Sequence, residues 1–587
     1  MCGINGFNFS DVEKIKRMMS MTASRGPDAN GIFENNNITL SHNRLSIIDL
    51  SKEANQPFSD EYLTITFNGE IYNYKELKEK LIVRGHKFKT NSDTEVIIKL
   101  YKEYEDKSFS MLSGIFAIAI WDENLRKLKL IRDIVGVKPL YYYHNINEKK
   151  FYFSSLIKPL IKSKDNNNLN EKALNQYANF WHNDLSETIF KDIHKVQPGE
   201  LITFQKNKID KKKILSFNFN SKVNNPKSEI ERIFSKQFVS DVPVALSLSG
   251  GVDSNLIFSI MNNNLDKSFK TYSVSFENGS NFDADTAEKN SKLLNFENER
   301  VHISSTDFIE NIEKIIEIME EPVGNQNSIA NYILSKKINE KVLFTGDGGD
   351  EIFTGYDKYK SIYLLSNLKK LGFIRNLNFF SKKNSDRLKF NKPEEYYLSF
   401  SEANLMRDQG NYINNFNKVN NQDLNFYHEI NNEESILNNV MFMDLQSWIQ
   451  NDSLARNDKL FMDSGIEVRV PFLDHEIIEK FLFMSEHKKI NFFKSNKPYI
   501  RKLFGKELAN LTKKKHGFNS PFSGWLQNEL YDFAKNILSK EYHNAEKYLN
   551  YKNINNFINK HKDNKQNSYL LWSLIVLQIF FKKYNFS

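Results

Sequence analysis

The sequence predicts two domains of different fold class: an α+β domain of stacked antiparallel sheets, then an α/β domain built on a parallel sheet with a helical C-terminal part. Paired strands with turn residues between them fill the first ~200 positions. Strands that alternate with helices follow, which is typical of a parallel sheet covered by helices. The length of 587 residues allows two to four domains, each with its own core.

In the first domain, residues 1–205, β-branched and aromatic residues alternate with polar ones in the segments expected as strands, 38–49, 62–70, 115–121 and 127–133. Apolar residues recur three and four apart in the expected helices, 73–84 and 94–105. Pro198-Gly199 marks a turn into a last strand. Residues 206–227 are polar, rich in Asn and without a sustained period, so we place the interdomain linker there.

In the second domain, residues 228–587, the same patterns predict helices at 228–240, 285–294 and from about 306, and strands at 242–248, 271–276, 300–303 and 342–344. The segment from Tyr569 to Phe581 is apolar except for Ser573 and Gln578. It is too short to cross a bilayer, and we expect a buried C-terminal helix.

The composition indicates an ordinary soluble protein, with 40% hydrophobic and 26% charged residues. The excess of 81 Lys and Arg over 73 Asp and Glu is small for this length, and no nucleic-acid-binding module is recognisable, so we expect no nucleic-acid partner. The single cysteine excludes an intramolecular disulfide and suits a reducing cytoplasm. The N-terminus lacks the apolar segment of a signal peptide, so a cytoplasmic location is expected.

Residues 249–254, Ser-Gly-Gly-Val-Asp-Ser, follow a predicted buried strand and open a helix. Backbone N–H groups at such a turn point at open space and suit a phosphate, whereas a turn that binds nothing is the alternative. The loop lacks the Gly-Lys-[Ser/Thr] end of a Walker A motif. Asp253 can hold magnesium, and Ser254 can donate to phosphate. The segment resembles the SGGxDS loop of the N-type ATP pyrophosphatases, which split ATP between its α- and β-phosphates.

A second cluster, residues 345–351, places carboxylates and glycines after another apolar strand. Three acids facing a triphosphate would repel it without a metal, so Mg²⁺ is implied, while an acidic surface turn is the alternative. The cluster resembles the SGxGxDE loop of asparagine synthetases, with Thr345 in place of Ser. The resemblance implies Asp253 and Asp350 as metal ligands. It also implies that Asp347, where some relatives carry Glu, manages the proton when ammonia attacks.

Three later segments extend this resemblance: Asp458-Lys459 with residues 465–474 (DR…xLExRxPFLD, with Lys459 for Arg), residues 497–501 (K-x-x-x-R), and residues 515–518 with Pro521 and Trp525 (KxGFxxPxxxW). Lys497 would stabilise charge as pyrophosphate leaves, and a helix-surface lysine is the alternative. The resemblance implies ATP binding by Leu248, Ser249, Gly250, Gly251, Asp253, Ser254, Val274, Thr345 and Gly346.

At the other end of the chain, Cys2 directly follows Met1. Removal of Met1 would give the cysteine a free α-amine, with a pKa of about 7.7–8.0, as its own general base. An early cysteine alone is more often an accident. Five ordered segments, however, resemble the class II glutamine amidotransferases, which are N-terminal-nucleophile glutaminases: Cys2-Gly3-Ile4, Arg25-Gly26-Pro27-Asp28, residues 44–49 (RLSIxD), residues 68–73 (NGEIYN) and Ser92-Asp93-Thr94-Glu95.

The residue types fit glutamine hydrolysis. The Asn68 amide and the Gly69 N–H can stabilise an oxyanion. Arg44 offers a planar fork for the carboxylate of glutamine, and Asp93, with Glu70, would take the ammonium group. A salt-bridged strand residue for Arg44 and a helix N-cap for Asp93 are the alternatives.

Residues 132–142 resemble the RDxxGxKPLYY segment that these glutaminases share with asparagine synthetases, and Leu156 stands where the family usually has Glu. That departure puts an interdomain hydrogen bond in doubt. The whole resemblance is to the glutamine-hydrolysing asparagine synthetase family. It implies that glutamine releases ammonia, that ATP adenylates the β-carboxylate of aspartate, and that ammonia displaces AMP.

Two alternatives stay open: the same chemistry on another carboxylate, such as a cell-surface sugar or a peptide, or an inactive ATP-binding regulatory relative. The expected partners are therefore the small molecules glutamine, aspartate and ATP, without nucleic acid or membrane. A homodimer is left open.

Overall fold

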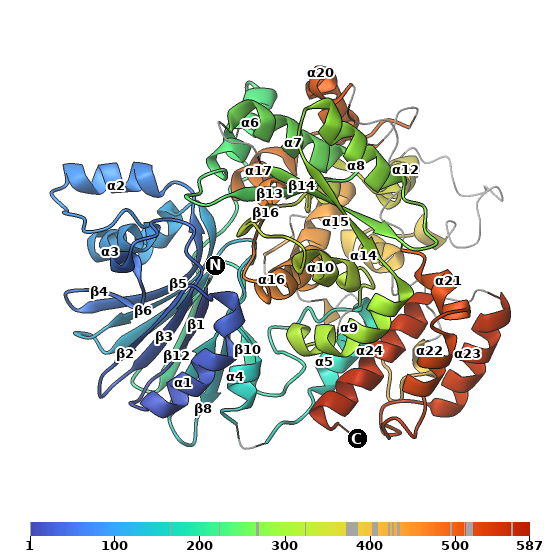
Figure 1. Ribbon diagram of the computed structural model, residues 1–587, viewed down its shortest axis with the longest axis horizontal. Coiled ribbons are helices and arrows are strands. Elements are labelled where there is room, and N and C mark those ends of the chain that lie inside the picture. Colours follow the sequence, from blue (N-terminus) through green and yellow to red (C-terminus); the bar gives the residue numbers. More distant parts are fainter. Residues whose placement is uncertain are drawn as a thin grey trace.

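The computed structural model describes the chain except for residues 1, 165, 222, 266–268, 323, 371–385, 402–408, 421–422, 425, 427, 431–434, 493–495, 510, 512–519, 565–567 and 587. The N-terminal domain lies beside the parallel-sheet domain, and the last helices pack below the latter (Figure 1). The predicted order of an α+β domain and then an α/β domain with a helical C-terminal part is confirmed.

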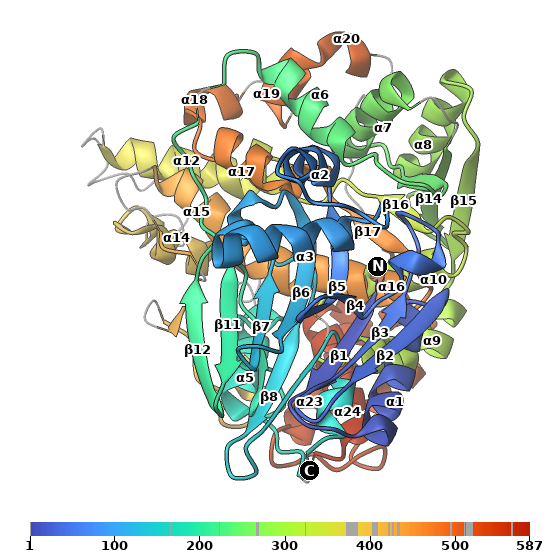
Figure 2. The ribbon, with the colours of Figure 1, turned by 90° about the vertical axis from the view of Figure 1, so that its left-hand side faces the viewer.

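Two six-stranded antiparallel sheets form the N-terminal domain (Figure 2). The first sheet has the order β10 (Ile193–Lys195), β8 (Tyr141–Asn145), β9 (Lys150–Ser154), β1 (Gly3–Phe7), β3 (Thr39–Arg44), β2 (Ala29–Glu34). The second has the order β12 (Lys208–Lys213), β11 (Glu200–Gln205), β7 (Lys127–Arg132), β6 (Gly114–Asp122), β5 (Leu63–Ile71), β4 (Phe58–Asp60). Apolar side chains of both sheets, among them Ile4, Leu40 and Leu130, form one buried cluster that holds the sheets together.

The helices of this domain are α1 (Val12–Met21), α2 (Tyr74–Val83), α3 (Asp93–Tyr104), α4 (Lys158–Ile161) and α5 (Glu171–Phe180). The strand predicted at 38–49 ends earlier, at Arg44. The chain turns away from the sheet there, and Asp49 adopts a left-handed conformation with φ of 52°.

The predicted linker contains a strand, because β12 pairs with β11 along its whole length. Five of its six residues are exposed. An edge strand with little buried surface needs few apolar residues and commonly carries lysines, so its polar sequence resembled a loop. The connection without regular secondary structure therefore begins after Lys213 and runs to the start of α6 (Pro226–Lys236).

The second domain is built on a five-stranded parallel sheet with the order β15 (Asn298–Ile303), β14 (Lys270–Phe276), β13 (Val244–Ser247), β16 (Val342–Phe344), β17 (Glu467–Arg469). The strand order reverses between β13 and β16, so the loops after these two strands part at a crevice. The early helices are α7 (Val252–Asn264), α8 (Phe282–Leu293), α9 (Ser305–Met319), α10 (Ser328–Ser335), α11 (Gly349–Phe353) and α12 (Asp357–Lys370).

A long helical rod crosses the lower side of this crevice: α15 (Ile436–Asp444) continues through the π-helical segment Leu445–Leu454 into α16 (Ala455–Met462). The remaining helices are α14 (Pro393–Phe400), α17 (His475–Phe481), α18 (Glu486–Lys489), α19 (Pro498–Leu503), α20 (Gly505–Leu508), α21 (Phe522–Gln527), α22 (Tyr531–Ile537), α23 (Tyr551–Asn564) and α24 (Ser568–Tyr584).

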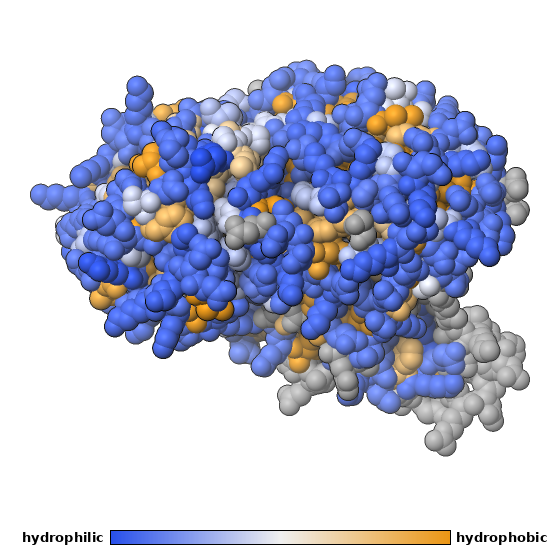
Figure 3. Space-filling view, turned by 90° about the horizontal axis from the view of Figure 1, so that it is seen from below, coloured by the Kyte–Doolittle hydropathy of each residue, from blue (hydrophilic) through white to orange (hydrophobic). Residues whose placement is uncertain are grey.

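The predicted buried C-terminal helix is α24, which packs against α9 and α22. Among the described residues, no helix is both long and apolar enough to cross a bilayer. On the face seen from below, hydrophilic residues dominate and apolar ones lie in separate small groups (Figure 3).

Candidate active sites

The N-terminal cysteine is held at the start of β1 by two hydrogen bonds. The Cys2 N donates to Asn68 Oδ1 at 2.9 Å, and Arg25 Nε donates to the Cys2 carbonyl oxygen at 3.1 Å. Burial raises the pKa of the Cys2 thiol, and the positive N-terminus partly opposes this shift. A buried thiol of raised pKa requires a nearby base to act as a nucleophile, and removal of Met1 would supply one, the α-amine of Cys2 itself.

The predicted oxyanion donors lie next to this cysteine on β5. Asn68 is fully buried, and its Nδ2 donates to no atom of the described residues. Gly69 has φ of +154°, and a Cβ there would lie 2.0 Å from the Ile115 carbonyl oxygen of the neighbouring β6. Glycine is therefore required by the approach of the adjacent strand, besides any approach of a ligand.

A small cavity opens beside Cys2. Its lining contains four of the predicted glutamine-site residues, Arg44, Gly69, Glu70 and Asp93, together with Cys2, Leu45, Ile47, Ile48, Ala54, Gln56, Phe67, Ser92 and Thr94, whereas Asn68 is outside the lining. The Arg44 guanidinium donates to the Ser51 carbonyl oxygen at 2.7 Å and to Asn55 Oδ1 at 2.8 Å. Arg44 thus also fixes the loop that forms one wall of the cavity.

Two buried acids face the same cavity. Asp93 is the first residue of α3, Ser92 rather than Asp93 is the N-cap, and Asp93 Oδ2 accepts from the Ile71 N–H at 3.1 Å. Burial raises the pKa of Asp93 to about 7. Burial likewise raises the pKa of Glu70, whose Oε2 pairs with Arg469 of β17 at 3.1 Å.

We expect glutamine to bind more tightly at pH 8 than at pH 6, by about tenfold, because its ammonium group favours the ionised form of an acid with a pKa of about 7. The Cys2→Ala protein allows this to be measured by titration calorimetry without turnover. In Asp93→Asn, binding should be weak and nearly independent of pH. Equal affinity of the Cys2→Ala protein at pH 6 and pH 8 would show that Asp93 does not meet the ammonium group.

The second site is a cleft of about 3220 Å³ at the crevice between β13 and β16. The predicted residues that line it are Ser249, Gly251, Asp253, Ser254, Val274, Thr345, Gly346, Asp347 and Asp350. Leu248, Gly250 and Lys497 are outside this lining: Leu248 is buried, Gly250 packs against Asp283, and Lys497 is buried against the lining carboxylates of Asp253 and Asp350. Ser249 N–H donates to Ser254 Oγ at 3.1 Å, so the turn is partly closed by its own side chains.

Lys497 joins the two carboxylates that the sequence assigned to metal. Its Nζ lies 2.5 Å from Asp350 Oδ1 and forms a close ion pair with Asp253. Lys497 is buried and precedes α19 with a left-handed backbone, φ 59°. A Cβ on Gly346 would lie 2.9 Å from that of Asp253, so this glycine lets the two loops meet.

Asp347 is held by three side-chain donors. Its Oδ2 accepts from Thr345 Oγ1 at 2.7 Å and from Asn457 Nδ2 at 2.9 Å. Its Oδ1 accepts from Ser453 Oγ at 2.5 Å. Ser453 is the second-last residue of the π-helical segment and Asn457 lies on α16, so the helical rod positions this carboxylate.

Several residues of the cleft had no role predicted from the sequence. Burial raises the pKa of Glu351 to about 7, and its Oε1 accepts from Tyr356 and Trp448 at 2.9 and 3.0 Å. The N-terminal domain also reaches the cleft, through Trp181 and its neighbours. Glu351 belongs to the motif at 345–351, so the sequence could have indicated its place in the cleft. Trp181 follows α5 and belongs to no motif, so the sequence offered no such indication. Lys515 and its predicted segment 515–518 lie outside the described residues.

Buried ion pairs join the two domains. Arg25 binds Asp458 through both terminal nitrogens, at 2.7 and 3.2 Å. Glu320, the residue after α9, accepts from the Ile157 and Lys158 N–H groups at 2.9 and 2.6 Å and pairs with Lys459 at 3.0 Å. Glu320 therefore places a carboxylate next to Leu156, the position that departs from the family, and joins the two domains there.

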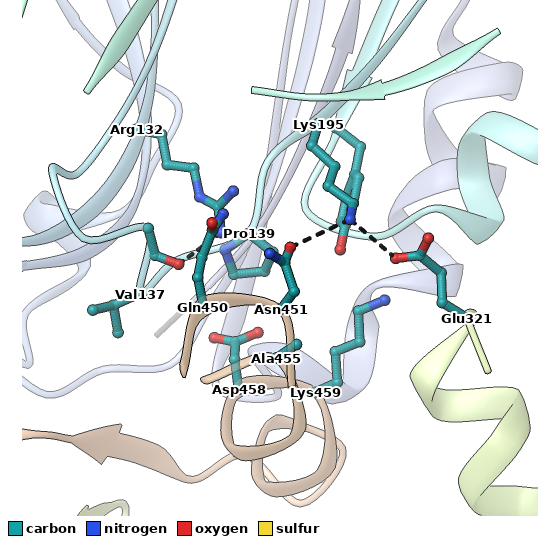
Figure 4. Close-up of a pocket in the computed structure, with 12 residues that line it drawn as sticks. Arg132, Val137, Pro139, Lys195, Glu321, Gln450, Asn451, Ala455, Asp458 and Lys459 are labelled. Atoms are coloured by element: carbon teal, nitrogen blue, oxygen red, sulfur yellow. Dashed lines mark hydrogen bonds and ion pairs between the residues drawn. The ribbon is translucent and has the colours of Figure 1, made fainter. Parts of the chain in front are cut away.

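Two small cavities at the domain interface share Tyr141, Glu321, Asn451, Ala455 and Lys459. Figure 4 shows the first, where Lys195 of β10 donates to Asn451 Oδ1 at 3.4 Å and pairs with Glu321 at 3.8 Å. The second cavity shares Trp181, His182 and Asp452 with the large cleft. The second cavity therefore adjoins the large cleft, whereas neither small cavity shares a lining residue with the cavity beside Cys2.

Comparisons with known proteins show the family of each domain. A family model described as a glutamine amidotransferase domain matches residues 1–215, and one described as asparagine synthase matches residues 227–582. The chain is 30% identical to asparagine synthetase [glutamine-hydrolyzing] 1 of Bacillus subtilis, over 99% of this chain and 96% of the relative. It is 28% identical to asparagine synthetase [glutamine-hydrolyzing] 3 of the same organism, over 82% and 80%.

Among solved structures, a glutamine phosphoribosylpyrophosphate amidotransferase from B. subtilis aligns at 15% identity and a TM-score of 0.29, over 51% of this chain and 65% of that one. The fold, the two sites and the matched families define a glutamine amidotransferase fused to an ATP-dependent synthetase. The chain belongs to the asparagine synthase family, which are ATP-dependent ligases with glutamine as the nitrogen donor.

Proposed function

We propose that this enzyme makes asparagine from aspartate, with nitrogen from glutamine and energy from cleavage of ATP to AMP and pyrophosphate. The observation that carries the proposal is the pairing of two complete sites in one chain: Cys2 beside the acid-lined cavity, and Lys497 between Asp253 and Asp350 at the cleft. The names of the relatives support aspartate as the acceptor.

In the glutaminase site, the α-amine of Cys2 would take the thiol proton as sulfur attacks the glutamine amide. The free Nδ2 of Asn68 and the Gly69 N–H would stabilise the oxyanion. Arg44 would pair with the carboxylate of glutamine, and Asp93 with the ammonium group. Glu70 offers a further acceptor, because its buried Oε1 has no hydrogen-bond donor among the described residues.

In the synthetase site, Ser249, Gly251 and Ser254 would bind phosphate oxygens at the helix N-terminus, with Thr345 and Gly346 across the crevice. Lys497 would stabilise negative charge as pyrophosphate leaves. Asp347, fixed by its three donors, would accept a proton when ammonia attacks the acyl-adenylate.

The donor set of the cleft fits magnesium. Asp253 and Asp350 converge from separate loops on one point, where Lys497 already marks a site for positive charge. Carboxylate oxygens are the ligands that Mg²⁺ prefers, so these two residues would hold it. When bound, the ion would neutralise charge on the triphosphate.

The two small cavities at the interface would form part of a path for ammonia between the sites, which would keep ammonia from bulk water. The large cleft belongs to residues 228–587 except where the segment around Trp181 closes it. Loops form the acceptor side of the cleft, so the acceptor is the least fixed part of the assignment.

The test is an assay of the full chain with Cys2 as its first residue. The protein is incubated with aspartate, ATP, Mg²⁺ and glutamine. We expect equal amounts of asparagine, AMP and pyrophosphate, with glutamate as the second product. Formation of ADP and phosphate would contradict the pyrophosphatase assignment. Formation of AMP only with another carboxylate would contradict aspartate alone.

A further inference from the structure

One helix contacts the machinery of both sites through consecutive residues. On α16, Asn457 Nδ2 donates to Asp347 Oδ2 at 2.9 Å, in the synthetase cleft. The next residue, Asp458, binds the Arg25 guanidinium at 2.7 and 3.2 Å, and Arg25 Nε donates to the Cys2 carbonyl oxygen at 3.1 Å. The side chains of Asn457, Asp458 and Arg25 therefore link the Asp347 carboxylate to the backbone of the nucleophile Cys2.

The two side chains diverge because successive residues on an α-helix are rotated by about 100°. Asn457 faces the loop after β16, whereas Asp458 faces the N-terminal domain. Figure 4 shows Asp458 and Lys459 on this helix opposite Arg132 and Lys195. The helix thus lies between the domains and is in contact with both.

The link is rigid at the glutaminase end. Arg25 and Asp458 are 1% and 3% exposed, and the guanidinium and the carboxylate meet in a two-point contact that fixes their relative orientation. A displacement of Asp458 would therefore be passed to Arg25, and from there to the carbonyl of Cys2.

The synthetase end can change with occupancy. Asp347 lies on the loop that faces the triphosphate, and all of its described donors except Thr345 come from the helical rod. The rod contains ten π-helical residues just before α16. π-Helical stretches are frequent at functional sites and give a helix an alternative hydrogen-bond register.

We propose that Asn457 and Asp458 are positioning residues that couple the two active sites, so that binding of ATP and acceptor near Asp347 places Cys2 for glutamine hydrolysis. This inference rests on the proposed function. Lys459 and Glu320 anchor the same helix to the N-terminus of α4 but do not contact Cys2, so they are outside the link.

The test measures how far ATP, Mg²⁺ and aspartate stimulate glutaminase kcat/KM, and how much glutamate forms for each pyrophosphate. Coupling between sites commonly amounts to about 5–150-fold, so we expect at least about fivefold stimulation in the wild type. In Asn457→Ala the stimulation should fall to about one, so glutamate should form at the same rate with and without ATP, Mg²⁺ and aspartate. Ammonia-dependent synthesis is measured for each variant as well. Its rate shows how far the substitution changes the synthetase site directly, and the glutamine-dependent rates are divided by it.

Ser453→Ala is the matched control, because it also removes one donor to Asp347 but does not adjoin Asp458. Ser453→Ala should keep the stimulation. Asn457→Gln should also keep it, because glutamine retains an amide that can donate to Asp347. Asp458→Asn should lose it, and a double variant with Asn457→Ala should add no further loss. If Asp458→Asn fails to fold, Asn457→Ala decides alone, since it leaves the buried ion pair in place.

The outcomes separate this inference from the proposed function. A wild type that forms no AMP with ammonia would contradict the proposed function. A wild type that forms AMP but shows no stimulation, or an Asn457→Ala protein as stimulated as the wild type, would overturn the coupling role.

Discussion

Replacing Cys2 with Ala should abolish glutamine-dependent synthesis and leave ammonia-dependent synthesis intact. The cavity keeps its other lining residues, so glutamine should still bind, but no thioester can form without the sulfur atom. The synthetase cleft contains no cysteine, because Cys2 is the only one in the chain. Product formed with glutamine and with ammonium salt, at a pH of about 8 where some free ammonia exists, measures both activities.

The matched control is a protein with an unprocessed Met1 or an added tag before Cys2. Its thiol is present, but its α-amine is an amide and cannot act as a base, so it should behave like Cys2→Ala. Glutaminase activity retained by Cys2→Ala would rule out this nucleophile. Loss of ammonia-dependent synthesis in a variant with an unchanged circular dichroism spectrum would rule out separate sites.

The sequence allowed the composition of each site to be predicted because both sites are built on short motifs. Asn68 and Gly69 stand together on β5, and Asp93 begins the helix predicted at 94–105, with Ser92 as its N-cap. The two glycine-rich loops follow parallel strands that proved to be neighbours, β13 and β16. The rule for parallel sheets therefore placed these two loops side by side, whereas the chemical roles of the residues in both sites stay predictions.

Contacts across the domain interface could not be predicted in this way. Arg25 and Asp458 are 433 residues apart, and each belongs to a recognisable motif whose partner is invisible in the sequence. Glu320 belongs to no quoted motif, yet its carboxylate accepts hydrogen bonds from the Ile157 and Lys158 N–H groups, next to Leu156. Strand β12 was missed for a different reason, since an exposed edge strand leaves no apolar period.

The second large effect is expected in Lys497→Ala, which should lose AMP formation by about 10²–10³-fold while glutamine hydrolysis persists. Lys497 is buried between Asp253 and Asp350, so its removal leaves two carboxylates facing each other without their cation. Charge that develops as pyrophosphate leaves would then meet repulsion in place of stabilisation. Pyrophosphate release with ammonia as nitrogen donor, and glutamate release without ATP, separate the two activities.

Lys480→Ala is the matched control for this variant. Lys480 also pairs with two carboxylates, Glu229 and Glu476, but neither of them lines the cleft. A partly exposed pair of this kind contributes about 1 kcal/mol or less, so this protein should synthesise at the wild-type rate. Asp350→Asn should lose AMP formation as Lys497→Ala does, because it removes a charge from the same cluster. Full synthesis by Lys497→Ala would mean that the lysine only neutralises the two acids, and that Mg²⁺ or solvent can replace it.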